Sequence, residues 1–280
     1  MTPSPPGLPP VALTIAGTDS GGGAGVAADL KVFAAHGVWG TCAITAVTAQ
    51  DTCGVQAVYP IPPAAVAAQI RVVADDLHPA ATKTGMLGST AVVEAVADAL
   101  VAARIPCLVV DPVAVSKHGD PLLAPDAIGA MRALILPLAT VVTPNLPEAL
   151  ALLGWEIELT DRPAMLAAAL ALLEFGPAAV LLKGGHLLAS ASDDAPDLLV
   201  RADGSRQWFE GPRIATRNTH GTGCVLSAAI CAGLSVGLDL EEACRRAKAY
   251  VTDSIARGLP LGAGIGPANP RVSGDDHQAR

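Results

Sequence analysis

The sequence predicts an α/β fold, a single domain built as a three-layer sandwich with helices on both faces of a mostly parallel central sheet. Short apolar runs that are rich in β-branched residues alternate along the chain with longer Ala- and Leu-rich runs of helical spacing. This alternation is the order of βαβ units, which form parallel sheets covered by helices. The chain shows no internal repeat and no linker composition. We therefore expect one domain over residues 11–268, between a disordered lead at 1–10 and a disordered tail at 269–280.

The expected elements follow one another in an order that the apolar pattern defines. Strands are expected at residues 11–16, 41–48, 80–84, 107–110 and 179–183, with a further strand that ends at Asn145. Helices are expected at residues 24–35, from Pro62 or Pro63 to Leu77, at 89–103, from about Glu148, at 163–175, after the glycine turn at 221–223, and at 240–257. Asp203-Gly204, between the runs 197–201 and 206–209, predicts a β-hairpin.

The composition limits the partners that this chain can have. Its net charge is −8, with 18 basic and 26 acidic residues, so we expect neither a nucleic-acid surface nor an anionic-membrane surface. No run of 18 uncharged apolar residues is present, and the start lacks the basic and apolar regions of a signal peptide. The six cysteines show no CxxC motif and no paired spacing, which indicates reduced thiols in the cytoplasm rather than disulfides or a zinc site.

A glycine-rich loop, residues 17–25, joins the first expected strand to the first helix. Loops that bind phosphate or small ligands have this order, but neither the GxxxxGK[ST] nor the GxGxxG fingerprint fits, because Val26 replaces the third glycine of the latter. Asp19 is expected to be a turn or N-cap residue. For Asp29, inside the helix, a solvated position and a ligand contact both remain open.

Polar side chains follow most of the expected strands. In open α/β sheets, ligands bind beyond the carboxyl ends of the strands, so these side chains should converge on one edge. Gln50 offers a donor and an acceptor, which suits the edge of a heterocycle. Asp111 stands at a strand tip, where a turn former or a Mg²⁺ ligand is typical. Glu148 is also explained by the helix dipole alone, but together with Asn145 it could meet one metal ion through water.

Three further residues have more ordinary interpretations. Lys83 lies in an apolar strand context and is expected to be paired, because burying an unpaired ammonium group is costly. Met86 is expected to be a pocket wall or part of the core. His118 has no partner at metal-ligand spacing and is expected on the surface.

The strongest candidate for chemistry is the stretch 218–232, which reads NTHGTGCVLSAAICA. Gly221 and Gly223 flank Thr222, and Cys224 leads into an apolar helical run, so the turn is expected at a helix N-terminus. N–H groups without intrahelical partners and the helix dipole let such a turn bind an anion. Cys224 would then face the anion. The alternative is a glycine loop that only caps a buried helix.

These motifs together resemble a known family. The sequences ALTIAGTDSGGGAG, ADLK, ITAVTAQDTCGV, KTGML, DPV, KHGDPLL, TPNLPEA, LLKGGH and NTHGTGC occur in this order between residues 12 and about 267. With them, the chain resembles the bacterial hydroxymethylpyrimidine/phosphomethylpyrimidine kinases of thiamine biosynthesis, in the ribokinase-like superfamily. The resemblance implies ATP- and Mg²⁺-dependent phosphorylation of 4-amino-5-hydroxymethyl-2-methylpyrimidine and then of its monophosphate. It also implies a homodimer.

The expected site is assembled from the residues and the resemblance. The catalytic turn comprises Gly221, Thr222, Gly223 and Cys224. The pyrimidine substrate would be contacted by Gly17, Asp29, Gln50, Met86 and Val113. The ATP side comprises Asn145, Lys183 and Thr219. Glu148 and Asp111 would serve the metal.

We expect Cys224 to act as the base of the reaction. Its thiolate would accept the proton of the substrate hydroxyl as the bond to phosphorus forms, and the helix N-terminus would lower the pKa of the thiol. N–H groups of residues 221–224 would hold the transferring phosphoryl group. The alternative is a buried structural thiol, the role expected for Cys42, Cys107, Cys231 and Cys244.

Several positions depart from the family pattern. Asp51 stands where Asn is usual, Ser20-Gly21 replaces Pro-Ser, Ala114 replaces Met, and Ala263 replaces His. All but Ala263 are expected to border the pocket and therefore to bear on pyrimidine selectivity.

Other functions remain as alternatives. A pyridoxal or pyridoxine kinase is the alternative within kinases, because that ring also carries a hydroxymethyl group. A pyrimidine-binding sensor without turnover is the alternative of another class, but it would be expected to lack a residue such as Cys224 or Glu148. A thiol-redox protein is disfavoured by the absence of CxxC.

Overall fold

The structure, a computed structural model, describes residues 7–113, 122, 124, 126–185, 187 and 194–270. Most of the expected lead at 1–10 and of the expected tail at 269–280 therefore lies outside the described residues, as do Ala114, the polar loop at 116–120 that contains His118, and His186. In the part of the chain that is described, no helix is both long and apolar enough to cross a membrane.

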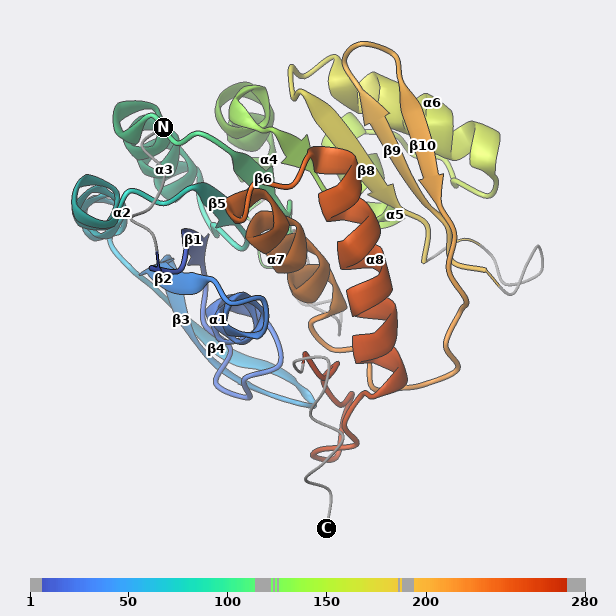
Figure 1. The fold of residues 1–280 in the computed structure, drawn as a ribbon, viewed down its shortest axis with the longest axis horizontal. Coiled ribbons are helices and arrows are strands. Elements are labelled where there is room, and N and C mark those ends of the chain that lie inside the picture. The colour runs from blue at the N-terminus through green and yellow to red at the C-terminus, as the bar shows by residue number, and fades with distance from the viewer. Residues whose placement is uncertain are drawn as a thin grey trace.

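The predicted mostly parallel sheet is confirmed. Within the described residues it has eight strands in the order β10-β9-β8-β7-β6-β5-β1-β2 (Figure 1). They are β1 (Val11–Ala16), β2 (Trp39–Ile44), β5 (Ala81–Thr84), β6 (Leu108–Val110), β7 (Val141–Val142), β8 (Ala179–Lys183), β9 (Asp197–Arg201) and β10 (Arg206–Phe209). Neighbours from β2 to β8 pair in parallel, whereas β9 and β10 form the predicted hairpin and run antiparallel. The loops after β1, β5, β6 and β8 therefore lie at one edge of the sheet.

Helices cover both faces of the sheet and make it the middle of three layers (Figure 1). One outer layer contains α1 (Gly25–Ala35), α7 (Thr222–Ser235) and α8 (Leu240–Ala256). The other contains α2 (Pro63–Leu77), α3 (Thr90–Ala103), α4 (Ala127–Ala130), α5 (Leu146–Leu153) and α6 (Arg162–Leu173), with a π-helical turn (Met131–Ile135) and a 3₁₀ turn (Leu136–Leu138) after α4. Val109 and Leu181 belong to the core on the α7 side, and their neighbours Val110 and Leu182 belong to the opposite core. Burial of both faces explains why these strands are continuous apolar runs.

Side-chain caps fix several helix starts where the sequence predicts them. Ser89 precedes α3 and accepts a hydrogen bond from the N–H of Val92. Asp161 and Asp239 do the same for α6 and α8. Such caps satisfy N–H groups that have no partner inside the helix.

One expected strand is wrong in its extent. The run 41–48 is not a single strand: β2 ends at Ile44, and β3 (Ala46–Asp51) leaves the main sheet to pair with β4 (Gly54–Pro60). Thr45 makes the break, because its N–H donates to the carbonyl oxygen of Ala16 and its hydroxyl donates to that of Met86. The resulting two-stranded β3–β4 arm was not predicted, and neither was the helical segment at 127–138.

The strand expected to end at Asn145 has ladder pairing only at Val141–Val142. Asn145 itself forms an isolated parallel bridge with Lys183. This bridge brings the start of α5 beside the end of β8.

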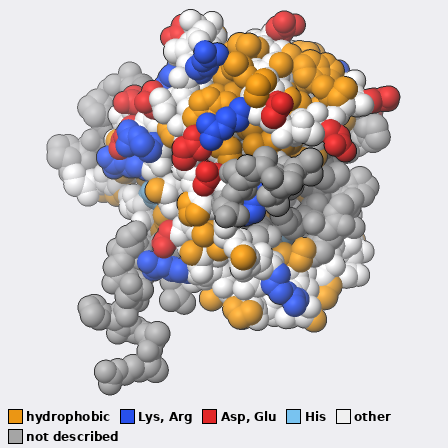
Figure 2. Space-filling view, turned by 90° about the vertical axis from the view of Figure 1, so that its right-hand side faces the viewer, with side chains coloured by type: hydrophobic (Ala, Val, Ile, Leu, Met, Phe, Trp, Pro, Cys, Tyr) orange, Lys and Arg blue, Asp and Glu red, His pale blue; other side chains and the backbone are white. Residues whose placement is uncertain are grey.

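Charges on the molecular surface are interspersed rather than segregated on the face in Figure 2. Basic and acidic side chains lie close together there, and hydrophobic side chains gather on its upper part. Among its described side chains, this face therefore carries no single acidic patch that would account for the net negative charge of the protein.

Candidate active site

A cavity of about 380 Å³ lies at the carboxyl edge of the parallel strands. Its wall includes residues from the loops after β1, β5 and β6, from the end of β8 and from the N-termini of α5 and α7. All but one of the residues expected at the site line it: Gly17, Gln50, Met86, Asp111, Val113, Asn145, Glu148, Lys183, Thr219, Gly221, Thr222, Gly223 and Cys224. The exception is Asp29. The tertiary structure thus brings together residues from most of the length of the chain.

The predicted anion-binding turn faces this cavity. Gly221 precedes α7 with a φ of +79°, a conformation that favours glycine. A Cβ at Gly221 would also collide with the carbonyl oxygen of Gly23, so the two glycine loops are in backbone contact. The first turn of α7 presents to the cavity N–H groups that are typical of an anion site. Its role in holding a phosphoryl group stays a prediction.

Asp19 holds the first glycine loop together, as the turn interpretation predicts. Its carboxylate accepts hydrogen bonds from the N–H groups of Gly21, Gly23 and Ala24. Nε2 of His220 lies 2.8 Å from the same carboxylate and connects the loop to the α7 turn. Burial opposes ionisation, but His220 and the N–H groups hold the pKa of Asp19 below its ordinary value. Asp19 is therefore a structural anion at neutral pH.

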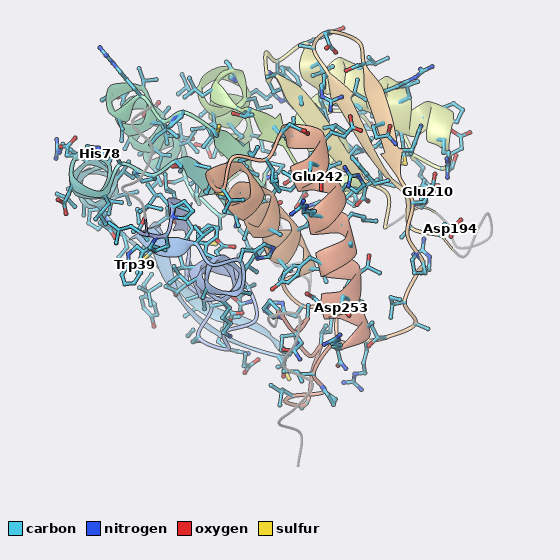
Figure 3. The ribbon with its side chains drawn as sticks, viewed as in Figure 1. Trp39, His78, Asp194, Glu210, Glu242 and Asp253 are labelled. Atoms are coloured by element: carbon cyan, nitrogen blue, oxygen red, sulfur yellow. The ribbon has the colours of Figure 1, made fainter. Side chains whose placement is uncertain are left out.

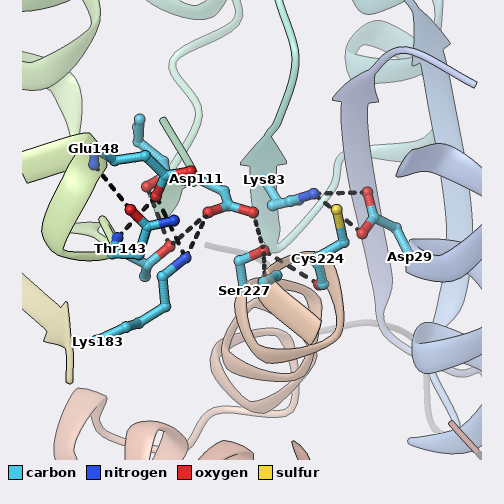
Figure 4. A network of polar contacts seen from close by, with 11 residues as sticks. Asp29, Lys83, Asp111, Thr143, Glu148, Lys183, Cys224 and Ser227 are labelled. Atoms are coloured by element: carbon cyan, nitrogen blue, oxygen red, sulfur yellow. Dashed lines mark hydrogen bonds and ion pairs between the residues drawn. The ribbon is translucent and has the colours of Figure 1, made fainter. Parts of the chain in front are cut away.

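Lys183 connects two carboxylates at the end of β8 (Figure 4). Its Nζ lies 3.1 Å from Oδ1 of Asp111 and 3.7 Å from Oε2 of Glu148. Asp111 also accepts a hydrogen bond from the hydroxyl of Ser227 on α7, at 3.2 Å. One cation thus holds two acidic groups from different strand ends in a single cluster.

Burial and the neighbouring charges act against each other in this cluster. Burial raises the pKa of Glu148 to about 7, although Lys183 opposes the shift. Burial also disfavours the charge on Asp111, but Lys183 and Lys83 outweigh it and hold the pKa of Asp111 below its ordinary value. The pKa of Lys183 lies above its ordinary value because Asp111 and Glu148 outweigh the effect of burial. The cluster therefore contains a charged Asp111–Lys183 pair and a Glu148 that burial makes harder to ionise.

Asn145 and Glu148 form a reciprocal cap at the start of α5. The side chain of Asn145 accepts a hydrogen bond from the N–H of Glu148, and Oε2 of Glu148 accepts one from the N–H of Asn145, both at 2.8 Å. The spacing of three residues therefore has a structural explanation of its own. The cap fixes the Glu148 carboxylate on the cavity wall, next to Lys183.

Asp29 is neither solvated nor on the cavity wall. It is fully buried, and its two carboxylate oxygens lie 2.9 and 3.1 Å from Nζ of Lys83. The hydroxyl of Thr14 donates to it at 2.6 Å. In this structure Lys83 and Thr14 occupy the carboxylate, and a contact between Asp29 and the substrate stays a prediction. Lys83 is paired, as predicted, and lines the cavity itself.

Cys224 lies in the first turn of α7 and lines the cavity. Burial raises the pKa of its thiol to about 11, although the ammonium group of Lys83 opposes the shift. The expectation of a lowered pKa is therefore wrong for the unliganded protein, because desolvation outweighs the favourable charges. All six cysteines are free: Cys231 and Cys244 are buried, Cys42 and Cys107 are partly buried, and Cys53 is exposed.

The wall expected to contact the substrate is formed by residues from three loops. A Cβ at Gly17 would lie 3.2 Å from the sulfur of Met86, so the missing side chain leaves room for the thioether. Met86 is 8% exposed, so it serves both as core and as wall. Gln50 is held through its backbone, whose N–H donates to the hydroxyl of Ser20 at 2.8 Å. These contacts fix the wall before any ligand binds.

The departures from the family pattern mostly have structural roles. Ser20 and Asp51 do not line the cavity, which corrects the expectation that they border it. Ser20 instead links the first glycine loop to Gln50. Asp51 accepts hydrogen bonds from the N–H groups of Cys53 and Gly54 and forms the turn of the β3–β4 arm. Neither side chain therefore forms part of the cavity wall.

Several cavity residues carry no sequence signal that would have assigned them to the site. Asp197 and Lys248 line the cavity and form an ion pair at 2.9 Å between β9 and α8. Asp197 also accepts a hydrogen bond from the N–H of Gly184, the residue after Lys183. Only the fold brings them to the cavity, because neither stands in a motif.

Two carboxylates are available to a magnesium ion, without a complete protein cage. Among the described residues, no group of three or more His, Cys, Asp or Glu side chains is arranged to hold a metal ion. Asp111 and Glu148 both approach Lys183 and both line the cavity. Magnesium is commonly held by one or two carboxylates together with phosphate oxygens and water. This donor set therefore fits an ion that arrives with a nucleotide.

Comparisons with known proteins agree with this geometry. The family model described as phosphomethylpyrimidine kinase matches residues 19–269. A hydroxymethylpyrimidine/phosphomethylpyrimidine kinase of Streptomyces coelicolor is 50% identical over 268 residues, which cover 95% of this chain and 96% of that protein. The structure of a phosphomethylpyrimidine kinase from Clostridium difficile 630 is similar with a TM-score of 0.76 and 38% identity, over 88% of this chain and 99% of that one. A pyridoxal kinase from Staphylococcus aureus, in complex with AMP-PCP and pyridoxal, is similar with a TM-score of 0.86 and 32% identity, over 96% of each chain.

Proposed function

This chain belongs to the phosphomethylpyrimidine kinase family, and we propose that it phosphorylates 4-amino-5-hydroxymethyl-2-methylpyrimidine with ATP and then phosphorylates the monophosphate to the diphosphate, in thiamine biosynthesis. The observation that carries the proposal is a single cavity shared by three groups of residues. These groups are the α7 turn with Cys224, the cluster of Lys183, Asp111 and Glu148, and the wall of Gln50 and Met86.

The arrangement suits phosphoryl transfer, which requires alignment and charge neutralisation more than covalent chemistry. In the proposed reaction the substrate hydroxymethyl group points at Cys224, and the N–H groups of the α7 turn hold the transferring phosphoryl group. Lys183 neutralises part of the phosphate charge. Gln50 and Met86 orient the ring.

Magnesium would supply neutralisation of charge between the phosphates. Asp111 and Glu148 would hold it, through water or directly, while phosphate oxygens complete its coordination. Binding of the metal with the nucleotide would then compete with Lys183 for these carboxylates.

The preference for the pyrimidine rests on sequence identity. The chain is 50% identical to the curated S. coelicolor pyrimidine kinase and 32% identical to the S. aureus pyridoxal kinase. The second candidate function is pyridoxal kinase activity, because the latter structure superposes over almost the whole chain. Both rings carry a hydroxymethyl group that could reach the same cysteine.

We also propose a homodimer formed through the β2 edge and the β3–β4 arm. Trp39 is 60% exposed and Tyr59 is 62% exposed, and Val47 lies directly opposite Tyr59 in the arm. Figure 3 shows Trp39 at the periphery, near β2. Large apolar side chains gathered on adjoining edges indicate an interface with a second copy of this chain.

The free cysteines are consistent with a reducing compartment such as the cytoplasm.

The proposed function is tested by ADP release from purified protein with Mg-ATP and each ring compound in turn. Products are resolved as monophosphate or diphosphate. Diphosphate formed from the pyrimidine, with little turnover of pyridoxal, supports the thiamine assignment. Turnover of pyridoxal alone would replace it with the second candidate, and no turnover of either would favour a binding protein.

A further inference from the structure

Lys83 and Asp29 place a full ion pair inside the protein. Both side chains are completely buried, and the ammonium group contacts both carboxylate oxygens. A buried ion pair is a weak source of stability, since desolvation of both charges offsets most of their attraction. An apolar pair of similar volume would serve the core at least as well. The pair therefore requires an explanation other than stability.

The Lys83 end of this pair reaches the cavity. Lys83 lines the cavity, whereas Asp29 does not. Gly85, two residues further along the chain, leaves space for the ammonium group, because a Cβ at Gly85 would lie 3.1 Å from Nζ of Lys83. Asp29 in turn is anchored to β1 by the hydroxyl of Thr14. The cation is thus fixed from behind and directed toward the cavity.

Cys224 is the neighbour that this cation faces. Figure 4 shows its sulfur beside the ion pair of Lys83 and Asp29. The charged groups that act on the thiol come from different elements: Lys83 from β5, Asp29 from α1, Asp111 from the end of β6 and Lys183 from the end of β8. Lys83 has the largest favourable influence on the thiolate, and the two carboxylates oppose it. The anions alone would leave less of Cys224 as thiolate.

We propose that Lys83 is a positioning residue whose fixed ammonium group stabilises the Cys224 thiolate, and that Asp29 holds Lys83 charged and in place. This inference rests on the proposed kinase function, in which Cys224 is the base.

The proton balance of the reaction gives Lys83 a defined task. In the resting protein, the thiol of Cys224 first releases its proton to solvent. The thiolate then takes the proton of the substrate hydroxyl while the new O–P bond forms, the bond from the γ-phosphorus to the bridging oxygen breaks, and ADP leaves. Release of the accepted proton restores the thiolate. Lys83 lowers the cost of the first and last steps and does not itself exchange a proton.

The test measures the reactivity of Cys224 without nucleotide or substrate. Removal of Lys83 alone would leave Asp29 as a buried unpaired charge, so the wild-type protein is compared with the double variant Asp29→Asn/Lys83→Met, which removes both charges together. Asp29→Asn is included to test whether Lys83 depends on its partner. Iodoacetamide alkylation of the Cys224 peptide is followed by mass spectrometry from pH 6 to pH 10. Cys224→Ser in each background identifies alkylation at other thiols, among them the exposed Cys53. Circular dichroism establishes that both variants are folded.

We expect the double variant to react at least about tenfold more slowly than the wild-type protein at pH 8, which corresponds to a thiol pKa about one unit higher. Identical pH dependence in the wild-type protein and the folded double variant would overturn the proposal. So would a lower melting temperature without any change in the pH at which Cys224 becomes reactive, because that result indicates a purely structural role. Kinase turnover of the wild-type protein is measured separately, so a failure of the kinase assignment is distinguished from a failure of this inference.

Discussion

Gly221 lies against the carbonyl oxygen of Gly23, so closely that no side chain fits between them. The contact joins the start of α7 to the first glycine loop. His220, which precedes Gly221, also approaches Asp19 of that loop at 2.8 Å. The anion turn and the loop on the substrate side therefore behave as one unit.

Gly221→Ala is expected to disrupt this unit. The new Cβ would force the loops apart in addition to straining a residue with φ of +79°. Gly237→Ala is the matched control, since Gly237 has φ of +85° and an added Cβ would meet nothing within 4 Å. We expect the control to lose only the conformational term, about 1–2 kcal/mol of unfolding free energy, and to retain turnover. Urea unfolding and ADP release measure both effects; equal losses in the two variants would contradict the close contact.

Cys224→Ala should lose most turnover, roughly 10²- to 10⁴-fold, because the base is removed. The KM for ATP should change little, since the proposed nucleotide contacts lie at other residues. Cys53→Ser, at an exposed thiol, is the control and should keep normal turnover. Near-normal turnover of Cys224→Ala would exclude Cys224 as the base.

Lys183→Met should reduce kcat/KM for ATP by roughly 10²- to 10³-fold, the range found when a charge-stabilising donor is lost. The variant would also leave Asp111 and Glu148 without the cation that lies 3.1 and 3.7 Å away. Arg71→Met is a suitable control, because Arg71 is an exposed cation on α2 that does not line the cavity. Steady-state kinetics at fixed Mg²⁺ provide the measurement, and parallel behaviour of the two variants would argue against a role for Lys183 at the phosphates.

Asp19→Asn should lower the unfolding free energy at pH 7 by roughly 2 kcal/mol, a typical value for hydrogen bonds to a charged group. The folded state holds the pKa of Asp19 below the ordinary 3.8, so its stabilisation is complete above that pH and is lost as the pH falls through the folded pKa. The difference between wild type and variant should therefore shrink as the pH is lowered from 7 toward 3. Urea unfolding across this range checks the trend. A difference that does not depend on pH would mean that the carboxylate charge is not what stabilises the loop.

Tyr59→Asp combined with Val47→Asp should convert a dimer into a monomer, because opposed carboxylates would replace apolar side chains on the β3–β4 arm. The control is Val72→Asp, which places the same kind of carboxylate at a 63% exposed position on α2, outside the proposed interface. It should leave the dimer intact. Size-exclusion chromatography with light scattering gives the mass of each variant. A wild-type protein with the mass of one chain would rule out the proposed interface.

The sequence by itself determined the α/β class, the order of most elements and many of the polar and glycine residues of the cavity wall. It succeeded because both faces of the sheet are buried, which leaves continuous apolar strands, and because parallel strands end at one edge. Polar residues at the ends of such strands, such as Asp111 and Lys183, therefore had to converge. The β3–β4 arm escaped prediction because a contact between residues far apart in the sequence, Thr45 and Met86, turns the chain away from the sheet.

Only the tertiary structure decided what each charged residue faces. Asp29 was expected in solvent or against a ligand, and instead it is buried against Lys83, 54 positions away in sequence. The pKa of Cys224 was expected to fall at a helix N-terminus, and instead burial raises it to about 11. Both outcomes depend on desolvation and on charges from distant elements. A residue type and its sequence neighbours do not specify these quantities, since they arise only when the strands and helices are packed together.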